Sequence, residues 1–135
     1  MAQHNELGKK GEHVAARHLL QSGYSIRHTD YRVGHKDIDI VAFKDGTTVF
    51  VEVKSRSSDL FGEPEEAVDN AKIRNLISAA NAYIARHNVS GKVRFDVITV
   101  VGTEEPYKVI HFENAFEPLG VSPYRGSDAF TKYNI

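Results

Sequence analysis

The stretch GHKDIDIVAFKDGTTVFVEVKSR, residues 34–56, contains two runs of mostly apolar residues separated by Asp45-Gly46. An Asp-Gly pair between two such runs is a strong sequence signal for a β-hairpin. The stretch therefore predicts strands at about 37–44 and 48–55, joined by a two-residue turn. The length of this turn sets the register of the hairpin, and so determines which residues of the two strands face each other.

The two predicted strands carry four charged residues at one end, although Asp and Glu are depleted in strands. The register places Asp39 opposite Glu52 and Asp37 opposite Lys54, with all four side chains on one face. Two carboxylates at this range repel each other unless one takes a proton or a cation binds. Oxygen ligands of this kind suit Mg²⁺ or Mn²⁺. The residues alone leave two interpretations open: a divalent-metal site for phosphodiester hydrolysis, or charged pairs on a solvated sheet face.

The apolar residues of the hairpin predict which face belongs to the core. The charged face continues as an apolar surface formed by Val41, Phe43 and Phe50. We expect the opposite face to be core, and it carries Ile38, Ile40, Ala42, Val49, Val51 and Val53.

The remaining sequence predicts an α/β domain with the order α-β-β-β-α-β, followed by a further strand. The first helix is expected to begin at Asn5 and to end before Gly23. The later elements are an edge strand at 24–33, a helix from about Pro64 to Ala85, strands at 93–101 and 107–112, and an irregular tail. We expect one domain over residues 1–135, with a core at about 6–101 and a mixed sheet.

Composition excludes several classes of protein and of site. The chain has no cysteine, which excludes disulfides and thiolate metal sites, and its seven histidines lack the spacing of zinc ligands. The first ten residues lack an apolar segment, and no apolar run approaches about 18 residues, so we expect neither a signal peptide nor a membrane span. A cytoplasmic location is the expectation. With a net charge of −1, binding to phosphates would need a local basic patch.

The hairpin and its surroundings resemble a known nuclease superfamily. Asp39, followed one strand later by Glu52-Val53-Lys54, resembles the PD-(D/E)XK superfamily. The YraN-like family of small bacterial proteins is a closer resemblance, and it is similar in turn to archaeal Holliday-junction resolvases. The resemblance to the YraN-like family is carried by LGKKGE (7–12), DIDIVA (37–42), VFVEVKSRSSDLFGEPEEAV (49–68), Lys72 and RFDVI (94–98).

The resemblance implies a restriction-endonuclease-like fold with an αβββαβ core, and DNA as the partner. It implies that Asp39 and Glu52 are metal ligands and that Lys54 positions or activates the attacking water. Glu12 matches an acidic residue on the first helix of such proteins, where it supports metal binding.

The chain also departs from the superfamily pattern beside these residues. Asp37 stands where relatives usually have Glu, and Lys36 stands where they usually have Gly. Ile38 replaces the proline that gives the superfamily its name. We therefore assign Asp37 only a supporting role.

Other charged and aromatic residues are weaker candidates. A phosphate-contacting rim around the site is one interpretation of Arg27, Arg32, Lys36 and Arg56, and Lys72 is a candidate contact to the DNA backbone; each is alternatively a solvated charge. Asp96 is expected to pair with a basic group in a structural role. Half-buried packing, rather than a stacking platform, is expected of Tyr31, Tyr83 and Tyr107.

The leading functional hypothesis is a Mg²⁺- or Mn²⁺-dependent DNA endonuclease, with branched DNA as one candidate substrate. The alternative is a non-catalytic nucleic-acid-binding module that keeps the nuclease fold, and an enzyme acting on small phosphate esters is a third class. Symmetric cutting of a junction would need a homodimer, for which Phe61 or the apolar residues of the tail are candidate contacts.

Overall fold

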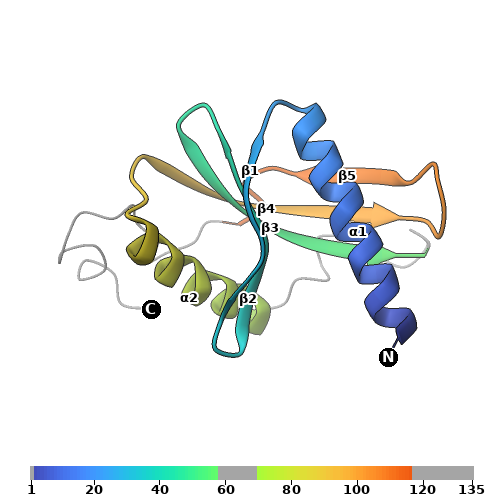
Figure 1. Cartoon of the computed structure of the whole chain (residues 1–135), viewed down its shortest axis with the longest axis horizontal. Coiled ribbons are helices and arrows are strands. Elements are labelled where there is room, and N and C mark those ends of the chain that lie inside the picture. The colour runs from blue at the N-terminus through green and yellow to red at the C-terminus, as the bar shows by residue number, and fades with distance from the viewer. Residues whose placement is uncertain (1, 58–69, 117–135) are drawn as a thin grey trace.

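The computed structural model describes residues 2–57 and 70–116. These ranges form two helices and five strands: α1 (Ala2–Gln21), β1 (Ser25–Val33), β2 (Lys36–Lys44), β3 (Thr47–Arg56), α2 (Asn70–His87), β4 (Lys92–Val101) and β5 (Lys108–Phe112) (Figure 1). The element order and the mixed α/β class agree with the prediction. No helix within these ranges is both long and apolar enough to cross a membrane.

The five strands form one sheet in the order β1-β2-β3-β4-β5. The β3–β4 pair is parallel and the other neighbours are antiparallel, so the sheet is mixed and β1 is an edge strand, both as expected. The predicted hairpin forms with Lys44 facing Thr47. Asp45 and Gly46 have φ values of 51° and 77°, the left-handed conformation that this turn requires.

The two helices cover opposite faces of the sheet. On one face, which we call the α1-side core, Val14, Ala15 and Leu19 pack against Ile40, Ala42, Val49, Val51, Ile98 and Val100. On the other face, the α2-side core, the buried residues of α2 pack against Ile38, Val41, Phe50 and Phe95. Burial of both faces is usual around parallel strand pairs, whose sequences are nearly continuous apolar runs.

The second face corrects part of the sequence prediction. Val41 and Phe50 are fully buried beneath α2 rather than forming an apolar surface. Ile38 is core as expected, but it lies in the α2-side core. Strict alternation fails at Ile38 because this end of β2 leaves the plane of the other strands.

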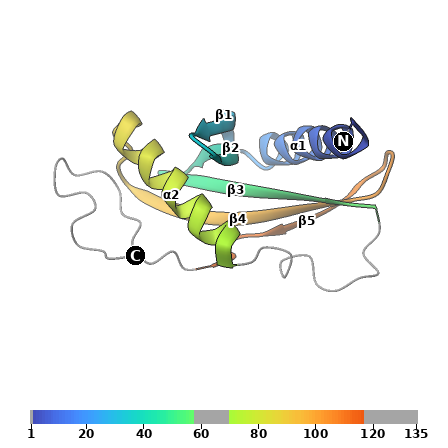
Figure 2. The same cartoon turned by 90° about the horizontal axis from the view of Figure 1, so that it is seen from below.

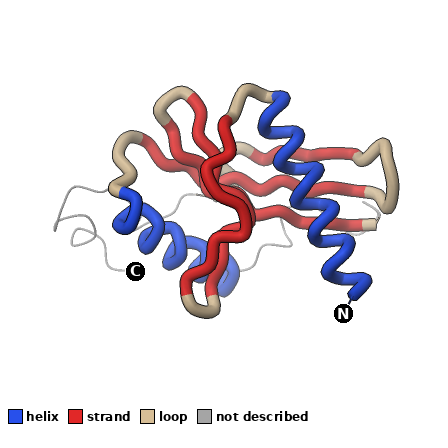
Figure 3. The backbone as a smooth tube through the Cα atoms, viewed as in Figure 1, coloured by secondary structure: helices blue, strands red, loops and turns tan. Residues whose placement is uncertain are grey.

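The ladder between β2 and β3 ends at the pair Ile40–Val51. Beyond it, residues 36–38 of β2 pair only with β1. Figures 2 and 3 show β1 and β2 leaving the layer formed by β3, β4 and β5. The expected ladder pairs of Asp39 with Glu52 and of Asp37 with Lys54 therefore do not form.

Helix α1 lies unusually close to β3 at Gly11. A Cβ atom at this position would collide with the Ser55 hydroxyl oxygen and lie 3.2 Å from the Ser55 Cβ. The Ser55 hydroxyl donates a hydrogen bond of 3.3 Å to the Leu7 carbonyl oxygen. Glycine thus permits the approach that places the next residue, Glu12, beside the sheet.

The helix boundaries differ in part from the prediction. α1 begins at Ala2, before the expected cap at Asn5, because Ala2 and Gln3 are good helix formers. Gly23 follows the helix with a φ of 90°, as expected of a terminating glycine. The predicted start of the second helix at Pro64, Phe61 and the tail lie outside the described residues.

Candidate metal and phosphate site

A pocket of about 300 Å³ opens where β2 separates from β3. We call it the carboxylate pocket. Its lining comes from both helices and both strands: Leu7, Gly8 and Glu12 of α1, Asp39 of β2, Glu52, Val53, Lys54 and Ser55 of β3, and Lys72 of α2. The fold therefore brings five sequence candidates, which are far apart in the chain, to one pocket.

Asp39 bridges the gap between the separating strands. Its Oδ2 accepts a hydrogen bond of 2.8 Å from the backbone N–H of Val53, the next amide beyond the end of the ladder. Burial, followed by the neighbouring Glu52 carboxylate, raises the pKa of Asp39 to about 7, although the Val53 hydrogen bond opposes this rise. Asp39 therefore holds a proton for a substantial fraction of the time near neutral pH.

Glu52 is almost completely buried, with 3% of its surface exposed. Its Oε2 lies 3.4 Å from the Lys72 ammonium and 3.5 Å from the Lys54 ammonium, which is longer than a usual hydrogen bond. Burial raises the pKa of Glu52 even though both lysines act to lower it. Partial burial would lower the pKa of Lys72, but the carboxylates of Glu52 and Asp39 outweigh burial and raise it.

Glu12 enters the pocket from α1. Partial burial raises the pKa of Glu12, and the negative charges of Asp30 and Asp37 raise it further. Asp37 does not line the pocket; its Cα partner is Arg32 in β1. Its charge still reaches the site, because it also raises the pKa of Asp39.

The acidic groups of this pocket fit a hard divalent cation in their chemistry. Burial raises the pKa values of both Asp39 and Glu52, and the charge of Glu52 raises that of Asp39 further; a bound cation would favour the ionised form of both carboxylates. Within residues 2–57 and 70–116, however, no three His, Asp or Glu side chains are grouped as metal ligands. Mg²⁺ is commonly held by one or two carboxylates and completes its coordination with waters and phosphate oxygens. The pair Asp39 and Glu52 matches that pattern.

The basic candidates divide between this pocket and other surfaces. Lys54 and Lys72 line the pocket. Elsewhere, Lys36 donates a 3.0 Å hydrogen bond to Ser78 of α2, and Arg32 lies 3.6 Å from Asp30. Arg56 is the last residue of β3, and Arg27 lies over the Phe43 ring in a different pocket.

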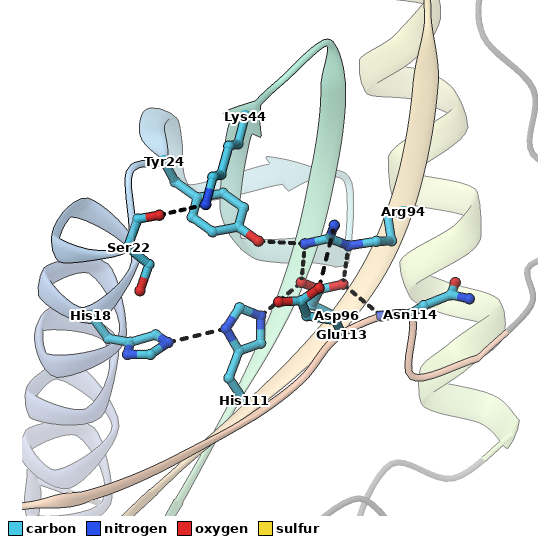
Figure 4. Close-up of polar contacts among 9 residues, drawn as sticks. All are labelled: His18, Ser22, Tyr24, Lys44, Arg94, Asp96, His111, Glu113 and Asn114. Atoms are coloured by element: carbon cyan, nitrogen blue, oxygen red, sulfur yellow. Dashed lines mark hydrogen bonds and ion pairs between the residues drawn. The ribbon is translucent and has the colours of Figure 1, made fainter.

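Asp96 has a structural role, as predicted. Its carboxylate is fully buried and accepts two hydrogen bonds of 2.8 Å from Arg94, one of 2.7 Å from His111 and one of 2.9 Å from the Asn114 backbone N–H. Figure 4 shows these residues gathered around Asp96. Burial would raise the pKa of Asp96, but these hydrogen bonds outweigh it and hold the pKa low. His111 Nδ1 lies 3.1 Å from His18 Nε2, so the network joins α1 to β4 and β5.

The amino-acid sequence that forms this pocket matches a known protein family. The model of the family described as "Uncharacterised protein family UPF0102" matches residues 11–100. The chain belongs to the UPF0102 family. This is the YraN family, so the resemblance that the motifs indicated is confirmed.

Relatives within UPF0102 align over most of this chain. A UPF0102 protein of Bacteroides thetaiotaomicron is 49% identical over 118 residues, covering 87% of this chain and 98% of the relative. One of Phocaeicola vulgatus is 47% identical over the same shares, and one of Persephonella marina is 40% identical over 82% of this chain and 92% of the relative. The region matched by the UPF0102 model contains Glu12, Asp39, Glu52, Lys54 and Lys72.

Proposed function

We propose that this protein is a divalent-metal-dependent endonuclease that hydrolyses phosphodiester bonds in DNA. The observation that carries the proposal is the carboxylate pocket, where Glu12, Asp39 and Glu52 lie with Lys54 and Lys72. Carboxylates with raised pKa values beside two ammonium groups suit the binding of a cation and of a phosphate together.

Asp39 and Glu52 would hold Mg²⁺ or Mn²⁺, and Glu12 would support the ion from α1. When bound, the ion supplies Lewis-acid stabilisation of charge on the phosphate oxygens. The Val53 amide fixes the Asp39 carboxylate, so this ligand is positioned before any ion arrives.

Lys54 and Lys72 act on the phosphate side of the reaction. A water oxygen forms a bond to phosphorus, and the bond from phosphorus to the leaving strand oxygen breaks. Lys54, 3.5 Å from Glu52, orients that water or donates a hydrogen bond to a phosphate oxygen as negative charge accumulates. Loss of one such electrostatic group typically lowers turnover by roughly 10²–10³-fold.

Helix α2 provides a local concentration of basic residues, although the net charge of the whole chain is −1. Between Asn70 and His87 it carries Lys72, Arg74 and Arg86 and no Asp or Glu. A local surface of this kind attracts a phosphate backbone even when the net charge of the chain is near zero. This supports DNA as the substrate, with branched DNA as the form that the family resemblance suggests.

One observation favours the alternative, a non-catalytic DNA-binding module. Both Lys54 and Lys72 lie against Glu52, the carboxylate that the ion would need. If these ion pairs persist on DNA, Glu52 stays neutralised by lysine and no metal site forms.

Cleavage and binding assays separate the two functions. We would incubate linear, nicked and four-way DNA with the wild type, Glu52→Ala and Lys54→Met, in Mg²⁺ or Mn²⁺ at fixed salt. The exposed Lys92→Met at the start of β4 is a matched control for loss of one lysine. The nuclease predicts that Glu52→Ala abolishes cleavage and that Lys54→Met lowers turnover by roughly 10²–10³-fold.

Binding changes provide the second readout. Loss of one phosphate contact should change the salt dependence of binding by about one unit at most. Wild-type binding without cleavage of any DNA form in either metal would contradict the nuclease and support the module. Full cleavage by Lys54→Met would keep the enzyme and remove Lys54 from its mechanism.

A further inference from the structure

A second pocket, of about 430 Å³, lies at the end of α2 opposite to Lys72. We call it the Arg27 pocket. Its lining includes Arg27 and His28 of β1, Phe43 of β2, and Tyr83 and His87 of α2. Among the residues that the structure describes, none lines both this pocket and the carboxylate pocket.

The Arg27 pocket combines ring surfaces with cationic groups. The Arg27 guanidinium carbon lies 4.3 Å from the centre of the Phe43 ring. His87 is stacked on Tyr83 with ring centres 4.1 Å apart, and the Tyr83 hydroxyl lies 2.7 Å from His28 Nδ1. Tyr83 is 4% exposed and therefore serves packing, as predicted from the sequence. Phe43 is half-buried and His87 is exposed, so these two rings present surface to the pocket.

The charge of this pocket is opposite to that of the carboxylate pocket. None of the described residues that line it is Asp or Glu, whereas Arg27 is cationic. A planar, electron-rich ring attached to an anion complements this surface. Stacking on aromatic rings and pairing with arginine are the two contacts that unpaired nucleotides make with proteins.

A row of basic side chains connects the β1–β2 hairpin with the Arg27 pocket. Lys36 donates a hydrogen bond to Ser78 of α2, at 3.0 Å. Arg86 donates one of 3.4 Å to the Tyr31 hydroxyl, which belongs to β1. Both contacts lie on the seam between α2 and the hairpin and are exposed. A DNA backbone that follows this seam would meet Lys36, then Arg86, and then Arg27 in the pocket.

We propose that the Arg27 pocket holds an unpaired base of a DNA strand, with the adjoining phosphate on Arg27. The base stacks on the ring surfaces of Phe43 and His87. This inference rests on the proposed function, because it assumes that DNA is the partner. It goes beyond it by assigning a site that reads unpaired DNA at a distance from the carboxylate pocket.

The separation between the two pockets sets the geometry. Phe43 lies four residues beyond Asp39 on β2, which is about 13 Å at 3.3 Å per residue. Stacked DNA advances 3.4 Å per nucleotide along one strand, so this separation equals roughly four nucleotides. A substrate with an unpaired base about four steps from the cut bond would engage both pockets, whereas a continuous duplex would engage one.

The test compares affinities for a forked DNA with an unpaired arm and for a duplex of the same length, by fluorescence anisotropy in EDTA so that nothing is cleaved. Arg27→Gln and Phe43→Leu remove the cation and the ring separately. Arg17→Gln, an exposed arginine of α1 that lines neither the Arg27 pocket nor the carboxylate pocket, is the matched control. We expect each pocket variant to weaken forked-DNA binding by roughly tenfold and duplex binding by less than about twofold.

A base analogue reports the stacking itself. In forked DNAs with 2-aminopurine at successive positions of the unpaired arm, binding by the wild type should quench the fluorescence at one position, and Phe43→Leu should abolish most of that quenching. Equal losses on fork and duplex, or a loss as large in Arg17→Gln, would overturn the proposal. If Phe43→Leu fails to fold, the exposed Arg27→Gln decides the question by its fork-to-duplex ratio.

The outcome for the pocket is separable from the outcome for the nuclease. If the wild type cleaves no DNA but the variants lose the preference for forked DNA, the result would support the Arg27 pocket and contradict the nuclease. Metal-dependent cleavage with an unchanged fork-to-duplex ratio in both variants would keep the enzyme and remove the pocket.

Discussion

The Asp39 carboxylate accepts a hydrogen bond from the backbone N–H of Val53, 2.8 Å away, at the point where β2 and β3 separate. The Asp39 side chain accepts a hydrogen bond from β3 at a point where the backbone ladder between β2 and β3 has already ended. The bond satisfies a partly buried amide, which would be costly to leave unpaired. It also directs one Asp39 oxygen toward β3. The end of the ladder therefore creates the carboxylate pocket and positions the Asp39 carboxylate in it.

The pH dependence of stability should reveal the crowded carboxylates in metal-free protein. Because the pKa of Asp39 is raised from 3.8 to about 7, the folded state binds more protons than the unfolded state between these values. Its contribution is favourable at low pH and is lost as pH rises toward 7. Asp39→Asn keeps the acceptor oxygen and removes this dependence.

Thermal unfolding in EDTA from pH 4.5 to 8 measures this effect. We expect Asp39→Asn to gain melting temperature relative to wild type as pH rises, with the difference levelling off above pH 7. The exposed Glu113→Gln is the control for loss of one carboxylate. A constant difference across this range would contradict the raised pKa that burial and the Glu52 charge give Asp39.

The close approach of α1 to β3 should make Gly11 intolerant of a side chain. In Gly11→Ala the new Cβ forces Ser55 to move and breaks its hydrogen bond to Leu7, so we expect a loss of about 1–3 kcal/mol in the free energy of unfolding. Gly8→Ala is a matched control in the same helix, because no atom lies within 4 Å of its added Cβ. It should stabilise by about 0.5–1 kcal/mol. Urea unfolding measures both; equal effects would refute the packing argument.

The Asp96 network predicts a larger loss. Arg94→Ala removes two of the hydrogen bonds to a fully buried carboxylate, and breaking a buried ion pair costs about 3–5 kcal/mol. Glu113→Gln removes only the exposed partner of Arg94, 3.8 Å away, and should cost less than about 1 kcal/mol. Denaturant unfolding of the two variants checks this order, and comparable losses would show that Asp96 does not depend on Arg94.

Local signals in the sequence predicted the hairpin, the edge position of β1 and the element order. The turn at Asp45-Gly46 and the apolar runs act over a few residues, so their pattern is readable without the fold. They did not predict where the β2–β3 ladder stops. That point depends on β2 leaving the sheet with β1, which is a property of the assembled strands.

Contacts between distant segments were the other part that the sequence did not predict. The sequence marks Lys72 as a candidate contact to a DNA backbone or as a solvated charge, and it did not predict that the Lys72 ammonium lies 3.4 Å from Glu52. The His18–His111 contact joins residues 93 positions apart, and no local pattern marks it. The Asp96–Arg94 pair differs from these contacts, because its partners lie two residues apart on one strand and a basic partner of Asp96 was predicted.

Direct Mn²⁺ binding tests the central claim, that Asp39 and Glu52 form a divalent-metal site. We would titrate Mn²⁺ into the wild type, Asp39→Asn, Glu52→Gln and the control Glu113→Gln, and measure the unbound ion by electron paramagnetic resonance. The same samples give the melting temperature, which a ligand of the folded state raises. We predict binding and a raised melting temperature in wild type and Glu113→Gln, and loss of both in Asp39→Asn and Glu52→Gln. Equal Mn²⁺ affinity in all four proteins would contradict the account.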